Sequence, residues 1–317
     1  MIISRFAPAP TGLLHLGHIV NALHVWGITR AVGGRVLLRI EDHDRQRSRP
    51  EYERAILDDL DWLGFVPDEP STDDFRVGAC VGRQRDREAH YEAALARLQA
   101  ADLVYACDCT RRDLREAMDA GPADGSPDGE LRYSGRCSNR QLEWRGGRGL
   151  RVRLAPSVEH FDDLRHGPTD QRPSEQCGDM LVKDRDGNWT YQFAVTVDDL
   201  DQGVTLVIRG DDLLPSTGRQ IQLARLLGRT VPPVYLHHAL VMKSATQKLS
   251  KADRDTSIRD MRDAGRSVED VIGLAAHGAR LAESDRPMTC AEAEARVAER
   301  FAVAIARLRA RAFSRSV

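Results

Sequence analysis

The stretch from Arg5 to His18 constrains this chain more than any other part of the sequence. A short apolar run, Ile2-Ile3, leads into a loop rich in proline and glycine that ends in His15-x-Gly17-His18. Beyond the loop, apolar residues recur at the spacing of an amphipathic helix, at Ile19, Ala22, Leu23 and Trp26. A strand is therefore predicted to end here and a helix to begin, which is where open α/β sheets bind phosphate ligands. Gly17 leaves room for a base or ribose, and two imidazoles can donate hydrogen bonds to phosphate oxygens.

The His15-x-Gly17-His18 sequence resembles the HIGH signature of class I aminoacyl-tRNA synthetases. The residues before it, Arg-Phe-Ala-Pro-x-Pro-Thr-Gly, are similar to the glutamyl branch of that family. A buried strand is predicted from Val36 to Ile40, and Arg39-Ile40-Glu41-Asp42 at its end resembles the RIED block of glutamyl-tRNA synthetases. Because the carboxyl ends of parallel strands face one crevice, Glu41 is expected beside the loop. The resemblance places Glu41 against the ammonium group of the substrate.

A third motif, Lys248-Leu249-Ser250-Lys251-Ala252, resembles the KMSKS loop of class I synthetases, although Leu249 and Ala252 depart from that pattern. Only four of the 46 basic residues are lysines. Two of them three positions apart therefore indicate sites that need a compact ammonium group on a flexible stem.

Composition sets limits on the class of protein. The 317 residues can bury a full core and suggest about two domains. No apolar run approaches the ~20 residues needed to cross a bilayer, and the amino terminus lacks a secretory pattern, so a cytoplasmic protein without a membrane partner is expected. A net charge of −2 gives no global reason to bind nucleic acid, so any such surface must be a local patch. We expect a monomer.

Cys107, Cys109 and Cys137 lie close together in the sequence. In a cytosolic protein this spacing favours a metal over disulfides, and a structural zinc prefers sulfur and nitrogen ligands in a closed tetrahedral shell. Spacing alone leaves the fourth position to a histidine or water, and reduced cysteines packing a small core are the alternative. The glutamyl-queuosine synthetase family has the pattern Cys-x-Cys…Tyr-x-x-x-Cys, and this resemblance makes Tyr133 the fourth ligand. The isolated Cys80, Cys177 and Cys290 are predicted to be structural.

Further elements follow from periodicity and turn residues. Helices are predicted from Pro50 to Leu63 and from Asp86 to Gln99. Strict alternation predicts a strand from Tyr191 to Val197, and a buried strand follows from Val204 to Ile208. A helix capped by Ser216 and a strand over Ala239–Met242 would complete a second strand–helix–strand unit.

The predicted fold is α/β: a class I synthetase Rossmann-like parallel sheet, split by a zinc-bearing insertion and followed by a helical subdomain. We assign residues 1–100 and 188–257 to the two halves of the catalytic domain. Residues 101–187 form the insertion, which in the family holds the acceptor nucleotide, with its short strands between Arg151 and Asp184. Residues 258–317 form the helical subdomain. No anticodon-binding domain is expected, because the 66 residues after Lys251 are too few.

The resemblance implies that the carboxylate of glutamate attacks the α-phosphate of ATP, accompanied by Mg²⁺, and pyrophosphate leaves. His15 and His18 would hold phosphate oxygens, with Gly17 beside the nucleotide, while Lys248 and Lys251 would close over the triphosphate. A dicarboxylate substrate requires two guanidinium groups, and Arg5 and Arg209 both lie at strand ends. Tyr191 would donate to a substrate oxygen. Ala7 and Ala9 would line the glutamate site, and Ala9 stands where the family usually has serine.

The resemblance covers about residues 1–255 and implies transfer of glutamate, activated without tRNA, to queuosine at the wobble position of tRNA(Asp). A short glutamyl-tRNA synthetase that charges the 3′ end of tRNA(Glu) is the first alternative. An inactive zinc-bearing paralogue that only binds tRNA is the second. A ligase for another amino acid is disfavoured by the paired arginines.

Overall fold

The fold is described from a computed structural model, which defines residues 1–119, 131–241 and 256–314. Its first unit is a parallel crossover of β1 (Ile3–Phe6), α1 (Leu16–Ala31) and β2 (Arg35–Leu38). The two strands pair from Ile3 opposite Arg35 to Phe6 opposite Leu38. Gly33, just after α1, has a φ of 68°, a conformation that glycine adopts without steric cost. The predicted strand–helix–strand unit at the amino terminus is therefore confirmed.

The second half of the sheet is built from β8 (Leu206–Gly210) and β9 (Val234–His238), which are parallel and joined by η2 (Asp211–Ser216) and α8 (Thr217–Leu226). The loop before β8 lies against β1, because the Thr205 N–H donates to the Ile3 carbonyl oxygen at 2.9 Å. The Ile3 N–H in turn donates to Thr205 Oγ1 at 2.9 Å. These contacts bring the carboxyl ends of β1 and β8 to the same edge.

Two strand predictions in this half were wrong. Residues Tyr191–Asp201 form the helix α7, not a strand. Every residue from Phe193 to Asp199 is buried, so the helix shows no polar face, and its alternating aromatic and β-branched residues imitate a strand. Among the described residues the last strand is β9, which ends before Ala239; residues 239–241 have no regular structure, and Met242 lies outside the described residues.

The middle of the chain divides between two sheets. An antiparallel sheet contains β3 (Val104–Cys107), β4 (Gly149–Val152) and β7 (Met180–Lys183), with α5 (Arg111–Asp119) and α6 (Pro173–Gln176) nearby in sequence. In contrast, the hairpin of β5 (Glu159–Asp163) and β6 (Gly167–Gln171) extends the sheet of β8 and β9, in the order β6-β5-β9-β8. The β5–β6 hairpin therefore belongs to the sheet of β8 and β9, and not to the sheet that contains Cys107.

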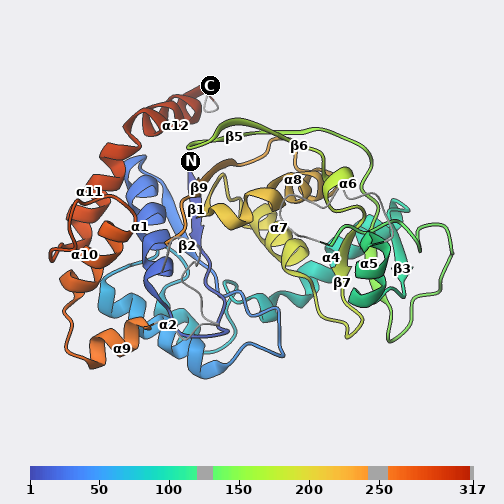
Figure 1. Cartoon of the computed structure of the whole chain (residues 1–317), viewed down its shortest axis with the longest axis horizontal. Helices are drawn as coiled ribbons and strands as arrows, with labels where there is room; N and C mark the ends of the chain where they lie inside the picture. The colour runs from blue at the N-terminus through green and yellow to red at the C-terminus, as the bar shows by residue number, and fades with distance from the viewer. Residues whose placement is uncertain (120–130, 242–255, 315–317) are drawn as a thin grey trace.

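Helices cover the remaining faces. The predicted helix α2 (Pro50–Leu63) is confirmed, with Gly64 in the left-handed conformation at its end. It is followed by α3 (Thr72–Arg76), η1 (Gln84–Arg87) and α4 (Glu88–Ala100). The carboxyl-terminal helices are α9 (Ile258–Asp263), α10 (Val268–Gly278), α11 (Cys290–Arg300) and α12 (Ala302–Ser314). Figure 1 shows α10 and α11 beside α1, at the opposite end of the molecule from β3 and α5.

The α1–α11 contact is close enough to require a small residue. A Cβ atom at Gly27 would lie 3.0 Å from the Cβ atom of Val297, so the backbone of α1 packs directly against a side chain of α11. The main core joins β1, α1, β2, α2, α10 and α11. Among the described helices, none has both the length and the apolar composition that crossing a membrane requires.

Candidate active site

A pocket opens at the carboxyl ends of β1, β8 and β9. It brings together all the described residues that the sequence predicted for substrate and nucleotide binding: Arg5, Ala7, Ala9, His15, Gly17, His18, Glu41, Tyr191 and Arg209. Asn21, Asp212 and His238 also line it. The pocket lies where strand ends, a helix amino terminus and polar side chains converge, as in ligand sites of open α/β sheets.

The two histidines of the loop cap the helix that follows them. His15 Nδ1 accepts from the Gly17 N–H at 3.1 Å, and His18 Nδ1 accepts from the His15 N–H at 3.1 Å. The rings lie 3.9 Å apart. Since both Nδ1 atoms act as acceptors, each neutral ring carries its proton on Nε2. The loop therefore presents two Nε2–H groups suited to donating to an anion.

Gly17 allows the histidine rings to lie close to the helix start. A Cβ atom at this position would lie 2.9 Å from His15 Cε1 and 3.1 Å from His15 Nδ1. Any larger residue at Gly17 would displace the His15 ring from its capping position.

On one wall of the pocket, Arg5 is held by an ion pair. Its Nε donates to both oxygens of Asp199, at 3.0 and 3.3 Å, and its Nη1 donates to the Ile208 carbonyl oxygen at 3.3 Å. Burial would raise the pKa of Asp199, but the guanidinium groups of Arg5 and Arg39 outweigh burial and lower the pKa to about 2. The Asp199 carboxylate is therefore charged at neutral pH and fixes Arg5 at the pocket.

Arg39 connects the same network to Glu41. It is fully buried, its Nη1 donates to Asp199 at 2.7 Å, and its Nη2 donates to Glu41 at 3.1 Å. Its Nε lies 3.8 Å from a carboxylate oxygen of Asp198. Glu41 is thereby oriented at the pocket by a cation behind it.

On the other wall, Arg209 is held by neutral groups. Its Nε donates to His237 Nε2 at 3.0 Å, its Nη1 to Gln220 at 2.7 Å and its Nη2 to Thr217 at 2.8 Å. Tyr191 also lines the pocket, and burial, followed by the charge of Glu41, raises the pKa of its phenol to about 12. Tyr191 is therefore a protonated phenol that can donate a hydrogen bond.

The two lysines of the KMSKS-like motif, Lys248 and Lys251, lie outside the described residues. The residues on either side of that gap lie at the pocket. Val241 lines it, and the Ile258 N–H donates to the Leu14 carbonyl oxygen at 2.9 Å. Ser257 pairs with His15 as an isolated antiparallel bridge.

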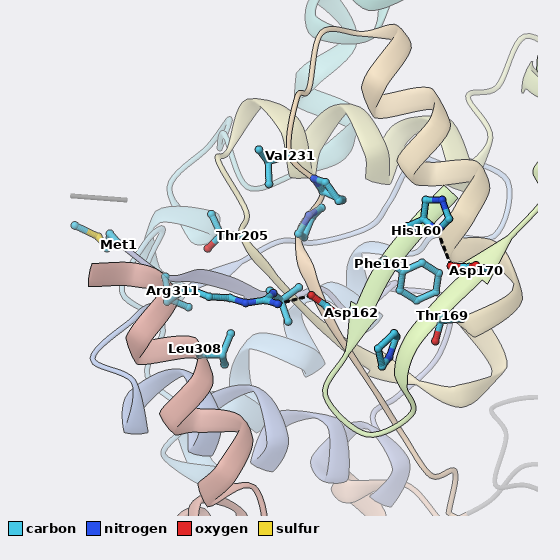
Figure 2. Close-up of a pocket in the computed structure, with 15 residues that line it drawn as sticks. Met1, His160, Phe161, Asp162, Thr169, Asp170, Thr205, Val231, Leu308 and Arg311 are labelled. Carbon is cyan, nitrogen blue, oxygen red and sulfur yellow. Dashed lines mark hydrogen bonds and ion pairs between the residues drawn. The ribbon is translucent and has the colours of Figure 1, made fainter. Parts of the chain in front are cut away.

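Another cavity, shown in Figure 2, lies at the opposite end of the strands, near Ile2 and Val234. Its charged side chains pair with one another, Arg311 with Asp162 and His160 with Asp170. It lacks the helix start and the convergent arginines of the pocket at the carboxyl ends.

The predicted cysteine cluster forms beside the β3–β4–β7 sheet. The sulfur atoms of Cys107, Cys109 and Cys137 lie within 4.8 Å of one another, which is close enough for all three to bind one metal ion. Tyr133 Oη lies 3.7 Å from Cys107 Sγ. Burial and the contact with Cys137 raise the pKa of Cys109 to about 12, so three thiolates would need a cation between them. The donor set fits a zinc ion.

Arg151 lies directly behind this cluster. Its Nε donates to Cys107 Sγ at 3.3 Å, and its Cζ atom lies 3.8 Å from the centre of the Tyr133 ring. Burial would raise the pKa of the Cys107 thiol, but the Arg151 guanidinium outweighs burial and lowers it. The cluster is therefore also suited to hold negative charge.

Comparison with known proteins gives the family of the chain. Residues 1–298 match the family described as "tRNA synthetases class I (E and Q), catalytic domain". A "Glutamyl-Q tRNA(Asp) synthetase" of Rhodobacter capsulatus is 40% identical over 293 residues, which cover 86% of this chain and 100% of that protein. A protein of the same name from Ralstonia nicotianae is 46% identical over 253 residues, covering 78% of this chain and 76% of the relative.

The chain belongs to the glutamyl-Q tRNA(Asp) synthetase family. The fold is also that of a larger class I synthetase. A glutamate tRNA ligase from Elizabethkingia meningosepticum, solved in complex with its amino acid, superposes with a TM-score of 0.72 at 26% identity. The match covers 92% of this chain and 64% of the ligase, so the chain spans less than two thirds of that protein's length.

Sequence reasoning missed the residues behind the pocket of this synthetase-family chain. Arg39, Asp199 and His237 are buried and do not resemble binding residues by position alone. A signal was present for Asp198-Asp199, since two consecutive carboxylates in an apolar run require buried cations. No comparable signal marked His237, whose partner Asp163 lies 74 positions away in the sequence.

Proposed function

We propose that this chain activates L-glutamate with ATP, without tRNA, and transfers the glutamyl group to queuosine at the wobble position of tRNA(Asp). The observation that carries the proposal is that Arg5, Arg209 and Glu41 line the same pocket as the two capping histidines. Two guanidinium groups and one carboxylate complement the two carboxylates and the ammonium group of glutamate. The names of the relatives support the acceptor.

Activation would proceed by attack of the α-carboxylate oxygen of glutamate on the α-phosphorus of ATP. The new oxygen–phosphorus bond forms as the bond to the pyrophosphate oxygen breaks, which leaves glutamyl-adenylate and pyrophosphate. His15 and His18 would donate their Nε2–H groups to phosphate oxygens, with Gly17 beside the nucleotide. Such chemistry depends mainly on positioning and charge neutralisation. Mg²⁺ bound to ATP would neutralise part of the triphosphate charge. We also propose that Lys248 and Lys251 contact this phosphate chain.

Recognition of glutamate would divide between the two walls. Arg5 and Arg209 each retain N–H groups beyond those used in the contacts described, because a guanidinium has five N–H donors. Glu41 would accept from the substrate ammonium group and Tyr191 would donate to a substrate oxygen. Ala7 and Ala9 would shape the floor of the site without a hydroxyl group.

We propose that residues 1–100 and 188–257 form the catalytic domain, 101–187 an insertion whose β5–β6 hairpin returns to the catalytic sheet, and 258–317 a helical subdomain. Within the insertion, Cys107, Cys109, Cys137 and Tyr133 would bind a structural Zn²⁺. The ion would crosslink β3 to the segment around Cys137. Metal analysis of the purified protein tests this. About one zinc per chain is expected, with loss of zinc in Cys137→Ser; a protein free of zinc after purification without chelators would contradict it.

The test of the proposed function is an acylation assay with radiolabelled glutamate. The chain is expected to label tRNA(Asp) that carries queuosine and to leave tRNA(Asp) without queuosine unlabelled. Periodate treatment locates the ester, because it destroys an unacylated 3′ diol. Labelling of tRNA(Glu) at its 3′ end would instead support the short glutamyl-tRNA synthetase. Absence of ATP–pyrophosphate exchange with glutamate would support a paralogue that only binds tRNA.

A further inference from the structure

Asp163, at the end of β5, lies directly under β9 of the catalytic sheet. Its Oδ2 accepts from the His237 backbone N–H at 3.1 Å and from His237 Nδ1 at 2.7 Å. Its Oδ1 accepts from the backbone N–H groups of Arg165 and His166, at 2.9 and 2.8 Å. Burial would raise the pKa of Asp163, but these bonds, led by that from His237, lower it. Asp163 is therefore an ionised carboxylate that only accepts hydrogen bonds.

An ionised Asp163 decides which nitrogen of His237 carries the proton. The ring is fully buried, and burial lowers its pKa to about 4, so it is neutral at pH 7. Its single proton must lie on Nδ1, facing Asp163, which leaves a lone pair on Nε2. Arg209 Nε donates to that lone pair at 3.0 Å. The opposite tautomer would place two N–H groups against each other at this contact.

The contact with His237 completes the fixation of Arg209. Thr217 Oγ1 lies 3.2 Å from His237 Nε2 and accepts from Arg209 Nη2, while Gln220 accepts from Nη1. The His237 ring is stacked on Tyr235, with centroids 5.9 Å apart and planes 9° apart, so it has a fixed orientation. Each of the three guanidinium nitrogens of Arg209 thus donates a hydrogen bond to a side chain of β9 or α8.

We propose that His237 is a positioning residue for glutamate binding: the Asp163–His237 pair fixes the guanidinium of Arg209 in the orientation that receives a substrate carboxylate. This inference rests on the proposed function, because it assumes that Arg209 contacts glutamate. It also gives the β5–β6 hairpin a role in the active site, since the hairpin supplies Asp163 to the sheet.

Two substitutions at His237 separate positioning from support of the fold. In His237→Gln, the side-chain amide reaches the position of Nε2 and can accept from Arg209, but the contact with Asp163 is lost. In His237→Asn, the shorter amide can donate to Asp163, but no acceptor reaches Arg209. A residue that only supports the fold through Asp163 would tolerate asparagine better, whereas a residue that positions Arg209 would tolerate glutamine better.

The measurement is the steady-state KM for glutamate and for ATP in pyrophosphate exchange, with urea unfolding of each variant. We expect the KM for glutamate to rise about tenfold or more in His237→Asn, equivalent to about 1.4 kcal/mol, and clearly less in His237→Gln. The KM for ATP should stay within about twofold in both. An equal rise in the two variants, or a larger rise in His237→Gln, would overturn the inference while leaving the proposed function intact.

A second measurement does not depend on activity. In protein labelled with ¹⁵N-histidine, the His237 ring should show a protonated Nδ1 and an unprotonated Nε2 at pH 7. A protonated Nε2 would overturn the inference even if the variants were too unstable to assay. Wild-type protein without any glutamate-dependent exchange would overturn the proposed function, and this inference with it.

Discussion

The two walls of the candidate active-site pocket hold an arginine each, but by different means. Arg5 lies in a network of buried charges, in which Asp199 is shared with Arg39. Arg209 is held by an imidazole, an amide and a hydroxyl group. Breaking a buried ion pair leaves an uncompensated charge, which costs several kcal/mol, whereas losing one neutral hydrogen bond costs about 1 kcal/mol.

If both arginines bind the substrate as proposed, the Arg5 wall couples substrate binding to stability, while the Arg209 wall separates them. On the first wall, Asp199 and Arg39 hold Arg5 and Glu41 in place, and they also balance each other's charge within the core. On the second wall, the partners fix geometry and carry no net charge except through Asp163. Two measurements test this contrast and two further ones extend it to the groups around the pocket, in order of decreasing effect.

The largest effect is expected for Arg39→Met. This change leaves Asp199 and Glu41 short of a buried cation, so the free energy of unfolding should fall by about 3–5 kcal/mol. Urea unfolding at pH 7 measures it. The matched control is Arg112→Met, because Arg112 is 87% exposed and pairs with Glu116, and its loss should cost less than about 0.5 kcal/mol. Similar losses in the two variants would remove the distinction between buried and exposed pairs.

The next effect is expected for Arg5→Ala. Glutamate-dependent pyrophosphate exchange should fall by at least about 100-fold, or about 2.7 kcal/mol, while ATP still binds. Asp199 keeps its bond to Arg39, so the variant should fold. Arg209→Ala should lose exchange to a similar extent but lose less stability, because its partners are neutral. Unchanged exchange in Arg5→Ala would remove Arg5 from the substrate site.

A smaller, graded effect is expected for His24→Gln. His24 is stacked on His238 behind the pocket, with centroids 4.8 Å apart, and burial, followed by His238, lowers its pKa from 6.5 to about 3. Between these values only the unfolded chain binds the proton, so wild-type stability should be lost as pH falls, by about 1.4 kcal/mol per pH unit from this group. When the free energy of unfolding is measured between pH 6 and pH 4, it should fall less steeply with falling pH in the variant than in the wild-type protein. The same dependence of stability on pH in both proteins would contradict the lowered pKa of His24.

The smallest effect is expected for Gly17→Ala. The added methyl group would displace the His15 ring and should raise the KM for ATP by about tenfold or less, with the KM for glutamate within about twofold. Stability should change by less than about 1 kcal/mol, because alanine is favoured in a helix. Gly146→Ala is the control, since a side chain there meets no atom within 4 Å. An ATP KM equal to that of the control would show that the ring tolerates displacement.

Much of the fold was predictable because its signals are local. The strand, loop and helix around His15, the helix Pro50–Leu63 with Gly64 at its end, and the apolar face of α4 all follow from periodicity and turn residues. The prediction failed for α7, where burial on every side removes the helical period. It failed again for β9, where two buried histidines replace the apolar residues that a strand usually shows.

The sequence by itself determined which residues would meet at the pocket, because motif spacing places Arg5, His15, Gly17, His18, Glu41 and Arg209 at strand ends and at a helix start. Only the tertiary structure decided how these residues are oriented. Asp199 comes from a helix that the pattern hid, and Asp163 comes from a hairpin far from His237 in the chain. Buried charges and tautomers depend on groups brought together by long-range packing, and local spacing does not encode those contacts.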